Sequence, residues 1–387
     1  MDDMPATKLV KPGGHIAAID NFRGLCILGM IIIHGAAWFH LSSVGFYLSH
    51  SLPFVLPGFM LLIGLMMGYH YMPRLTSKSA RIKIQRRLFW RAIKIMLYAY
   101  VFSIFFYLIF RQPSGYNSCI PDAQRSIKAI LDLVTLQRIN HRMAVLILIS
   151  FLLLLSQIII WTHKYSRRWY VMIASGLALY LSFLAIGGPF PDPPHTLGRL
   201  PIFLSLEWKF PFLAWSSFLF FGVAIGSLAY KYIKSGKLVK LYSGMILLGT
   251  LGILIWLALA YFMYKTSDKY IFPRELSAPP TPYYVVYCLS LCLLIMGLFL
   301  FLGERKIKIP GEHLLSVFGK HSLFCFIYHW CVLHVVYIIL KRTKAPLSVR
   351  WFALAGLVFV VYISAILQAR FLARRKAAKL KAKASAD

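Results

Sequence analysis

Apolar residues gather in long uninterrupted blocks along this 387-residue chain, rather than in the alternating stripes typical of soluble domains. A helix of about 20 apolar residues crosses the roughly 30 Å hydrocarbon core of a bilayer. Helices are required, because backbone polar groups in lipid find partners only within their own segment. We therefore predict an all-α, polytopic membrane bundle of about ten transmembrane helices. The blocks are 24–41, 52–72, 92–110, 143–162, 169–187, 211–230, 241–264, 283–302, 322–340 and 351–368.

The pattern between the blocks indicates a single membrane domain over residues 1–387, without an added soluble module. Residues 1–18 lack the apolar core of a signal peptide and form a predicted cytoplasmic segment. The basic stretch 73–95 is expected to continue the third helix into the cytoplasm, and 369–387 forms a basic cytoplasmic tail. Three longer loops are predicted on the outer side, at 111–142, 188–210 and 265–282.

The formal net charge of +31 indicates a polyanionic partner, which is either nucleic acid or a membrane surface. The placement of the charges along the chain distinguishes the two. With a cytoplasmic N-terminus, the inward segments hold 29 of the 43 Lys and Arg residues and the outward segments hold the other 14. This bias follows the positive-inside rule and predicts that both termini are cytoplasmic. We therefore expect anionic membrane lipids as a partner of the tail, and no nucleic acid.

The 12 acidic residues all fall outside the predicted spans. A proton-driven transporter normally needs carboxylates within the membrane, so this placement argues against one. It also leaves histidine as the residue type that can act as a base inside the bilayer. Neither the six cysteines nor the 12 histidines show a metal-ligand spacing, so no metal cofactor is expected.

The first span carries an unusual set of polar residues in the stretch "IDNFRGLCILGMIIIHGAAW". Arg23 and His34 are 11 residues apart and share one helix face, with Asp20 on nearly the same face. If Arg23 marks the cytoplasmic boundary, His34 lies about 16 Å deeper. A neutral imidazole there is a candidate general base, although a histidine that only hydrogen-bonds a neighbouring helix gives the same pattern.

A second histidine lies at a similar depth on the ninth span, "SLFCFIYHWCVLHVV". His329 lies about 10 Å past the start of this span, so it is predicted to meet His34 near the middle of the bundle. Packing beside Trp330 is an equally good reason for His329 alone, and His334 is a weaker candidate. His40 and His50 flank the first outward turn and are interpreted as interfacial.

The stretch "IDNFRGLCILGMIIIH" resembles the first helix of the transmembrane acyltransferase superfamily, which includes acyltransferase-3 and heparan-alpha-glucosaminide N-acetyltransferase-like membrane proteins. That helix carries an Asp, an Arg three residues later, usually a small residue next, and a polar residue 14 after the Asp. The matching positions are Asp20, Arg23, Gly24 and His34. Four further stretches resemble later parts of the second branch: "LPGFMLLIGLMMG", "TLQRI", "FPFLAWSSFLFFGVAIGSL" and "GKHSLFCFIYHW".

The resemblance implies transfer of an acyl group, most simply acetyl, from cytoplasmic acyl-CoA to a hydroxyl or amine of an extracytoplasmic glycan or glycolipid. His34 is then the catalytic base or a transient acyl carrier, with His329 as its companion. Two departures keep the choice of histidine open. The acidic residue expected before the second-helix proline is absent from "SLPFVLP", and the N-acetyltransferase-like branch has its catalytic histidine after the first helix, near His40 or His50. The look-alikes favour a bacterial inner membrane.

The residues themselves suggest where both substrates bind. Acyl-CoA carries several phosphates, and arginine binds phosphate through two hydrogen bonds. A cationic cytoplasmic site is therefore predicted from Arg23, Arg86, Arg87 and Arg91, although a positive-inside loop explains much of this charge. On the outer side, Gln137, Arg138 and His40 are the candidates for acceptor binding, and an interfacial anchor is the alternative.

Two other classes of function compete with the enzyme. A transporter or flippase for an anionic or lipid-linked substrate would use His34 and His329 as a gate or proton relay, and would move substrate without acyl-CoA. A scaffold that kept the fold without the chemistry would not bind acyl-CoA. The missing intramembrane carboxylates and the lack of an internal repeat favour the acyltransferase.

Overall fold

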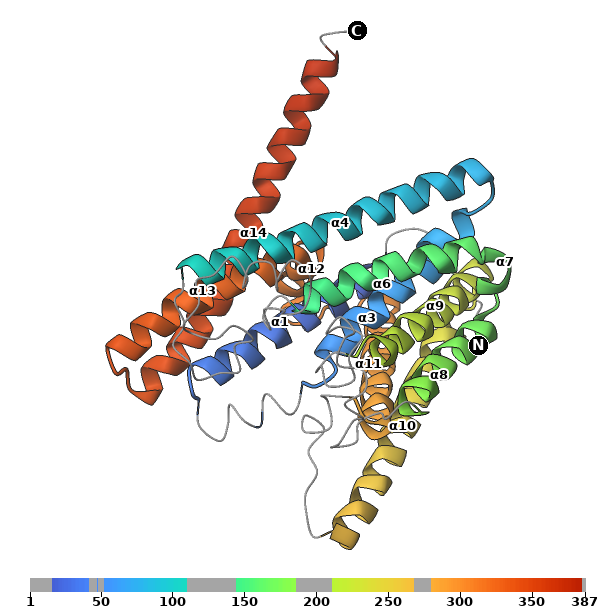
Figure 1. The fold of residues 1–387 in the computed structure, drawn as a ribbon, viewed down its shortest axis with the longest axis horizontal. Helices are drawn as coiled ribbons and strands as arrows, with labels where there is room; N and C mark the ends of the chain where they lie inside the picture. The colour runs from blue at the N-terminus through green and yellow to red at the C-terminus, as the bar shows by residue number, and fades with distance from the viewer. Residues whose placement is uncertain are drawn as a thin grey trace. The chain divides into compact units, whose positions relative to one another are not determined.

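The computed structural model describes residues 16–41, 47, 52–109, 144–185, 211–267 and 280–384. The regular secondary structure of these residues is helical, which confirms the all-α prediction (Figure 1). Within them, nine helices are long and apolar enough to span a membrane, and α8 (Trp169–Ala185) is a shorter apolar helix. Each of the ten predicted blocks overlaps one of these helices, so the polytopic membrane fold is confirmed. The cytoplasmic placement of both termini stays a prediction.

The helices have the following bounds in chain order. They are α1 (Ala17–Trp38), α3 (Val55–Met66), the π-helical turn η1 (Met67–Tyr71), the 3-10 turn η2 (Met72–Arg74), α4 (Lys78–Ile109), α6 (Ala144–Trp161), α7 (His163–Ser166), α8 (Trp169–Ala185), α9 (Phe212–Lys234), α10 (Leu238–Ser267), α11 (Pro282–Glu304), α12 (Glu312–Lys320), α13 (Ser322–Arg342) and α14 (Leu347–Ala384).

The chain divides into two compact units, and each is described by itself. The large unit contains Leu56–Phe301. The small unit joins Ile16–Val55, near the start of the chain, to Leu302–Asp387 at its end. The small unit therefore contains α1 and α13, which carry His34 and His329, together with α12 and α14. The expectation of one domain over 1–387 stays a prediction.

In the small unit, α1 packs most closely against the short helix α12. Gly24 of α1 lies against the backbone of Leu315, and Gly319 of α12 lies against the backbone of Asp20. Such close approach of two backbones needs residues without a Cβ atom. At the other side of α12, His321 Nδ1 contacts Gln368 Oε1 of α14 at 3.1 Å. The α12 helix is thus held between α1 and α14.

In the large unit, two glycine pairs bring α3 and η1 against α9. Gly64 and Gly68 face the backbone around Leu219 and Val223, while Gly222 and Gly226 face α3 in return. This is the small-xxx-small packing typical of membrane helices. The second predicted span, 52–72, differs from a regular α-helix, because its last part widens into the π-helical turn η1.

Several helices extend beyond the predicted blocks, among them α1 and α14. The α1 helix begins at Ala17, so Asp20 lies in the first turn of a candidate span and is 8% exposed. The candidate spans of the described residues thus include Asp20 and Glu304 near their ends, although both residues lie outside the predicted blocks. The α14 helix continues to Ala384, so most of the basic tail is helical rather than irregular.

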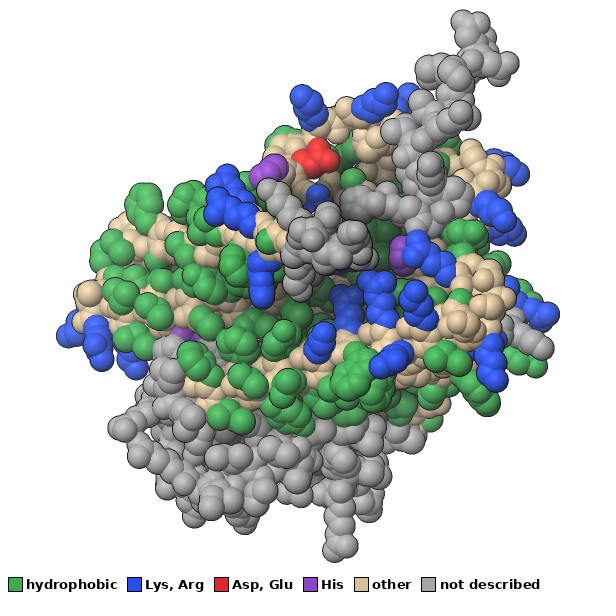
Figure 2. Space-filling view, turned by 90° about the horizontal axis from the view of Figure 1, so that it is seen from above, with side chains coloured by type: hydrophobic (Ala, Val, Ile, Leu, Met, Phe, Trp, Pro, Cys, Tyr) green, Lys and Arg blue, Asp and Glu red, His purple; other side chains and the backbone are tan. Residues whose placement is uncertain are grey.

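The outer surface of the described helices has the composition expected of a membrane protein. On α10, large apolar side chains such as Leu247, Leu254 and Ile255 are more than half exposed. In water this exposure would be costly, whereas lipid tails cover it without a penalty. Figure 2 shows a face on which hydrophobic and basic side chains predominate and acidic ones are scarce.

The contact between α1 and α12 predicts a strong effect of one added methyl group. Gly24→Ala places a Cβ atom against the backbone of Leu315, which has no flexible end to move aside. We expect a loss of about 1–3 kcal/mol in the free energy of unfolding, measured by titration with sodium dodecyl sulfate. Gly356→Ala on α14 is the matched control, because nothing lies within 4 Å of its Cβ position. Equal stability of the two variants would show that the packing is looser than described.

Candidate active site

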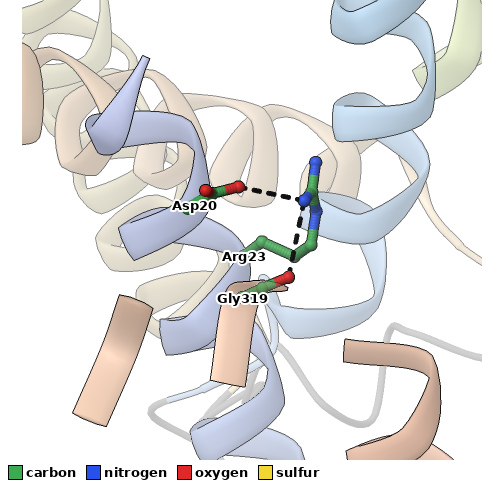
Figure 3. Close-up of polar contacts among 3 residues, drawn as sticks. All are labelled: Asp20, Arg23 and Gly319. Atoms are coloured by element: carbon green, nitrogen blue, oxygen red, sulfur yellow. Dashed lines mark hydrogen bonds and ion pairs between the residues drawn. The ribbon is translucent and has the colours of Figure 1, made fainter. Parts of the chain in front are cut away.

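The polar group at the start of α1 is built from one carboxylate, one guanidinium and one carbonyl (Figure 3). Arg23 Nη1 donates to Asp20 Oδ1 at 3.1 Å and to the carbonyl oxygen of Gly319 at 3.4 Å. Nearby, Asn21 Nδ2 donates to Glu312 Oε1 of α12 at 3.4 Å. The Arg23 side chain is 23% exposed, so these contacts enclose most but not all of it.

The two predicted histidines meet in the small unit. His34 Nδ1 of α1 and His329 Nε2 of α13 are 3.0 Å apart, and the two rings are nearly parallel, with 5° between their planes. His329 is completely buried, while His34 is half-buried. The prediction that these helices bring their histidines together is confirmed, and the accessible member of the pair is His34.

The backbone of α13 determines which nitrogen of each ring carries a proton. His329 Nδ1 is 3.1 Å from the carbonyl oxygen of Cys325, and a carbonyl can only accept a hydrogen bond. The proton of neutral His329 is therefore on Nδ1, and its Nε2 accepts from His34 Nδ1–H. Neutral His34 then keeps the lone pair on Nε2, which is the nitrogen required of a base.

Aromatic rings surround the histidine pair. The Trp330 ring lies 4.4 Å from that of His34, and the Trp38 ring lies 4.7 Å from that of His334. His334 Nδ1 donates to the carbonyl oxygen of Trp330 at 2.7 Å, in the same way that His329 donates to Cys325. His329 thus lies in a buried, largely aromatic environment in which hydrogen bonds are strong.

The other predicted site residues fall into three sets. His40 follows α1 at an exposed position with left-handed backbone geometry (φ 49°). Gln137 and Arg138 lie outside the described residues. Arg86, Arg87 and Arg91 are exposed on α4 of the large unit, so their joint site with Arg23 stays a prediction.

Several contributors were not identified from the sequence. The carbonyl of Cys325 sets the tautomer of His329, and the carbonyl of Gly319 orients Arg23. A signal for the first exists, because a helical histidine can reach the carbonyl four residues earlier. Nothing comparable marks Gly319, whose contact with α1 depends on how two distant segments pack.

The comparison with protein families agrees with this geometry. The profile of the acyltransferase-3 family, described as an acyltransferase domain, matches residues 16–369. The chain belongs to the acyltransferase-3 family. This family is one of the two that the first helix resembles, and the match includes α1, α12, α13 and the part of α14 up to residue 369. A search of curated proteins found no significant match.

Membership in the acyltransferase-3 family makes this protein an integral membrane acyltransferase. The Asp20, Arg23 and His34 set that suggested the family is therefore the part of the enzyme to examine for chemistry. In the described part of the chain, no group of three or more His, Cys, Asp or Glu side chains is arranged to hold a metal ion. The expectation of a metal-free reaction stays a prediction.

The hydrogen-bonded pair predicts that His329 positions His34 in this acyltransferase. His329→Leu removes the acceptor for His34 Nδ1–H, and we expect acyl transfer to fall by roughly 10-fold to 100-fold. His329→Gln keeps an acceptor oxygen and should restore much of the rate. Initial rates and thermal stability are measured for both variants. Equal losses with leucine and glutamine would assign His329 a packing role.

Proposed function

We propose that this membrane acyltransferase moves an acyl group, most simply acetyl, from cytoplasmic acyl-CoA to a hydroxyl or amine of an extracytoplasmic glycan or glycolipid. The observation that carries the proposal is the hydrogen-bonded series from His34 through His329 to the Cys325 carbonyl. In this series the lone pair of His34 is on Nε2. His34 is half-buried, and the chain belongs to a family of acyltransferases.

The proposed transfer begins with proton removal by His34 Nε2. As the acceptor loses its proton, its oxygen or nitrogen bonds to the thioester carbonyl carbon, giving a tetrahedral intermediate. Collapse of this intermediate breaks the carbon–sulfur bond, and the imidazolium returns its proton to the leaving thiolate. Atoms and charge therefore balance within one cycle. A covalent route through acyl-His34 would use the same nitrogen.

The surroundings of His34 suit a transient positive charge. Its Nδ1–H donates to His329 Nε2, and this hydrogen bond strengthens when His34 becomes an imidazolium. The face of Trp330, 4.4 Å away, adds an attraction between cation and ring. Both contacts favour the protonated state formed during transfer more than the resting neutral state, as catalysis requires.

Arg23 is the proposed anchor for the donor at the cytoplasmic end of the site. Asp20 and the Gly319 carbonyl hold its guanidinium in one orientation, so little side-chain entropy is lost on binding a phosphate. Helical rise separates Arg23 from His34 by about 16 Å. This spacing suits an extended donor with a charged head and a reactive thioester at the far end. A bacterial inner membrane is the proposed location.

The role of His34 predicts a large loss of activity on its removal. His34→Ala should lower transfer by a factor of about 10²–10⁴, because the acceptor loses its base. The measurement is mass spectrometry of envelope glycans from a deletion strain complemented with each variant, in which the missing acyl mass also identifies the group transferred. His313→Ala is the control, since His313 is an exposed residue of the same unit. Full acylation with His34→Ala would remove His34 from the mechanism.

Donor binding predicts a change in the acyl-CoA requirement. Arg23→Gln and Arg87→Gln should each raise the apparent KM for acyl-CoA by about tenfold, because each loses a charge-assisted hydrogen bond to phosphate. Lys237→Gln removes the same charge from another exposed position on the predicted inner side and should leave KM unchanged. If all three variants keep the original KM, the basic residues serve membrane topology and the donor binds elsewhere.

A further inference from the structure

A cluster of cations lies at the turn between α13 and α14. Lys341 and Arg342 end α13, Lys344 lies within the turn, and all three are exposed. Arg350 follows in the first turns of α14. Between Glu312 and Asp387 the sequence contains no acidic residue, so no neighbouring carboxylate along this part of the chain balances the cluster. We call Lys341, Arg342 and Lys344 the basic turn.

Membrane topology does not account for the basic turn. With a cytoplasmic N-terminus, α13 ends on the outer side, where the positive-inside rule disfavours Lys and Arg in short connections. The other short outward segment, 41–51, contains no Lys or Arg at all. The remaining outward cations belong to the three long predicted loops, on which the rule acts weakly. The basic turn therefore opposes the rule and calls for another cause.

Ring contacts connect the basic turn to the histidine pair within the small unit. The Trp330 ring, next to His34, lies 6.1 Å from that of Trp38, and Trp38 lies 5.0 Å from Tyr337. Lys341 Nζ is 6.0 Å from the centre of the Tyr337 ring. We call Trp330, Trp38 and Tyr337 the aromatic ladder. It runs from the proposed base to the first cation of the basic turn.

Arg350 attaches the turn to the end of α1. Its Nε donates to the carbonyl oxygen of Ala345 at 3.0 Å, and its Nη1 donates to that of Phe39 at 3.4 Å. Phe39 directly follows Trp38 of the ladder. The basic turn is thus held beside the outer end of the ladder, and its three cations are exposed, so that a ligand can reach them.

We propose that the acceptor is an anionic glycan or glycolipid that lies along the aromatic ladder and places a carboxylate or phosphate on the basic turn. This inference rests on the proposed function and names the acceptor's charge. Tyr337 is eight residues past His329, about 12 Å along α13. The anionic group therefore belongs to a part of the acceptor beyond the sugar that receives the acyl group. Sugar rings between them stack on the half-buried rings of Trp38 and Tyr337, while the buried Trp330 forms the inner end of the ladder beside His34.

The phosphate of a membrane lipid shares this chemistry and has to be distinguished. The ladder favours the acceptor, because it continues from the basic turn to the pair, whereas lipid binding would need only the turn. The experiment therefore uses nanodiscs of phosphatidylcholine alone, and a second set that contains phosphatidylglycerol. Phosphatidylcholine has no net charge, so in these nanodiscs any effect of anionic charge on binding comes from the glycan.

The test compares glycan binding after charge has been removed from the protein, from the glycan, or from both. Binding to immobilised nanodiscs is measured for envelope glycan of a deletion strain, either untreated, carboxyl-reduced or dephosphorylated. The protein is wild type or the variant Lys341→Gln/Arg342→Gln/Lys344→Gln. The matched control, Lys376→Gln/Lys379→Gln/Lys381→Gln, loses the same charge from the basic tail. Circular dichroism of each variant verifies that the helices are intact.

We expect untreated glycan to bind wild type and the tail control about tenfold more tightly than it binds the turn variant. Neutralising the glycan should remove this advantage, and the treatment that does so identifies carboxylate or phosphate. The inference is overturned if the turn variant binds as wild type does, if untreated glycan fails to bind, or if the variant changes only phosphatidylglycerol binding. His34→Ala should keep the charge preference, so a failed mechanism and a failed acceptor assignment give different results.

Discussion

The hydrogen bond between His34 and His329 is the interaction on which the proposed chemistry of this protein depends. An imidazole in an apolar interior needs a partner, because an unpaired buried polar group is costly. His329 meets that need twice, through the Cys325 carbonyl on its own helix and through His34 on another. The second bond gives His34 a defined tautomer. His34, which without a partner would weaken the bundle, is thereby oriented as a candidate base.

The position of the pair follows from the packing of α1 against α12. Arg23 contacts the carbonyl of Gly319, and α13 begins just after α12 ends. His34 lies 11 residues beyond Arg23, and His329 lies ten residues beyond Gly319. The contact between His34 and His329 shows that these two paths end at one level, although His321 separates α12 from α13. The glycine contacts at Gly24 and Gly319 set the distance at which this match begins.

The parts of the structure that depend on periodicity and length could be predicted from the sequence. Ten apolar blocks predict the helices, and the spacing of Arg23, His34 and His329 predicts that they share a region. Contacts that join distant segments could not be predicted in this way. The close approach at Gly319 and the ion-paired, buried Asp20 depend on which helices become neighbours, and a single sequence does not encode that in any local pattern.

The charge of the chain has two physical origins rather than one. Topology accounts for cations in short inward segments, since they hold those segments at an anionic membrane face. It does not account for Lys341, Arg342 and Lys344, which end the helix that carries His329. In the small unit, a guanidinium at the start of α1 and a basic turn at the end of α13 lie at opposite ends of the two helices that form the histidine pair. The proposed transfer between two anionic substrates requires a cation for each and a neutral base between them, because a protonated imidazole cannot accept the proton of the acceptor.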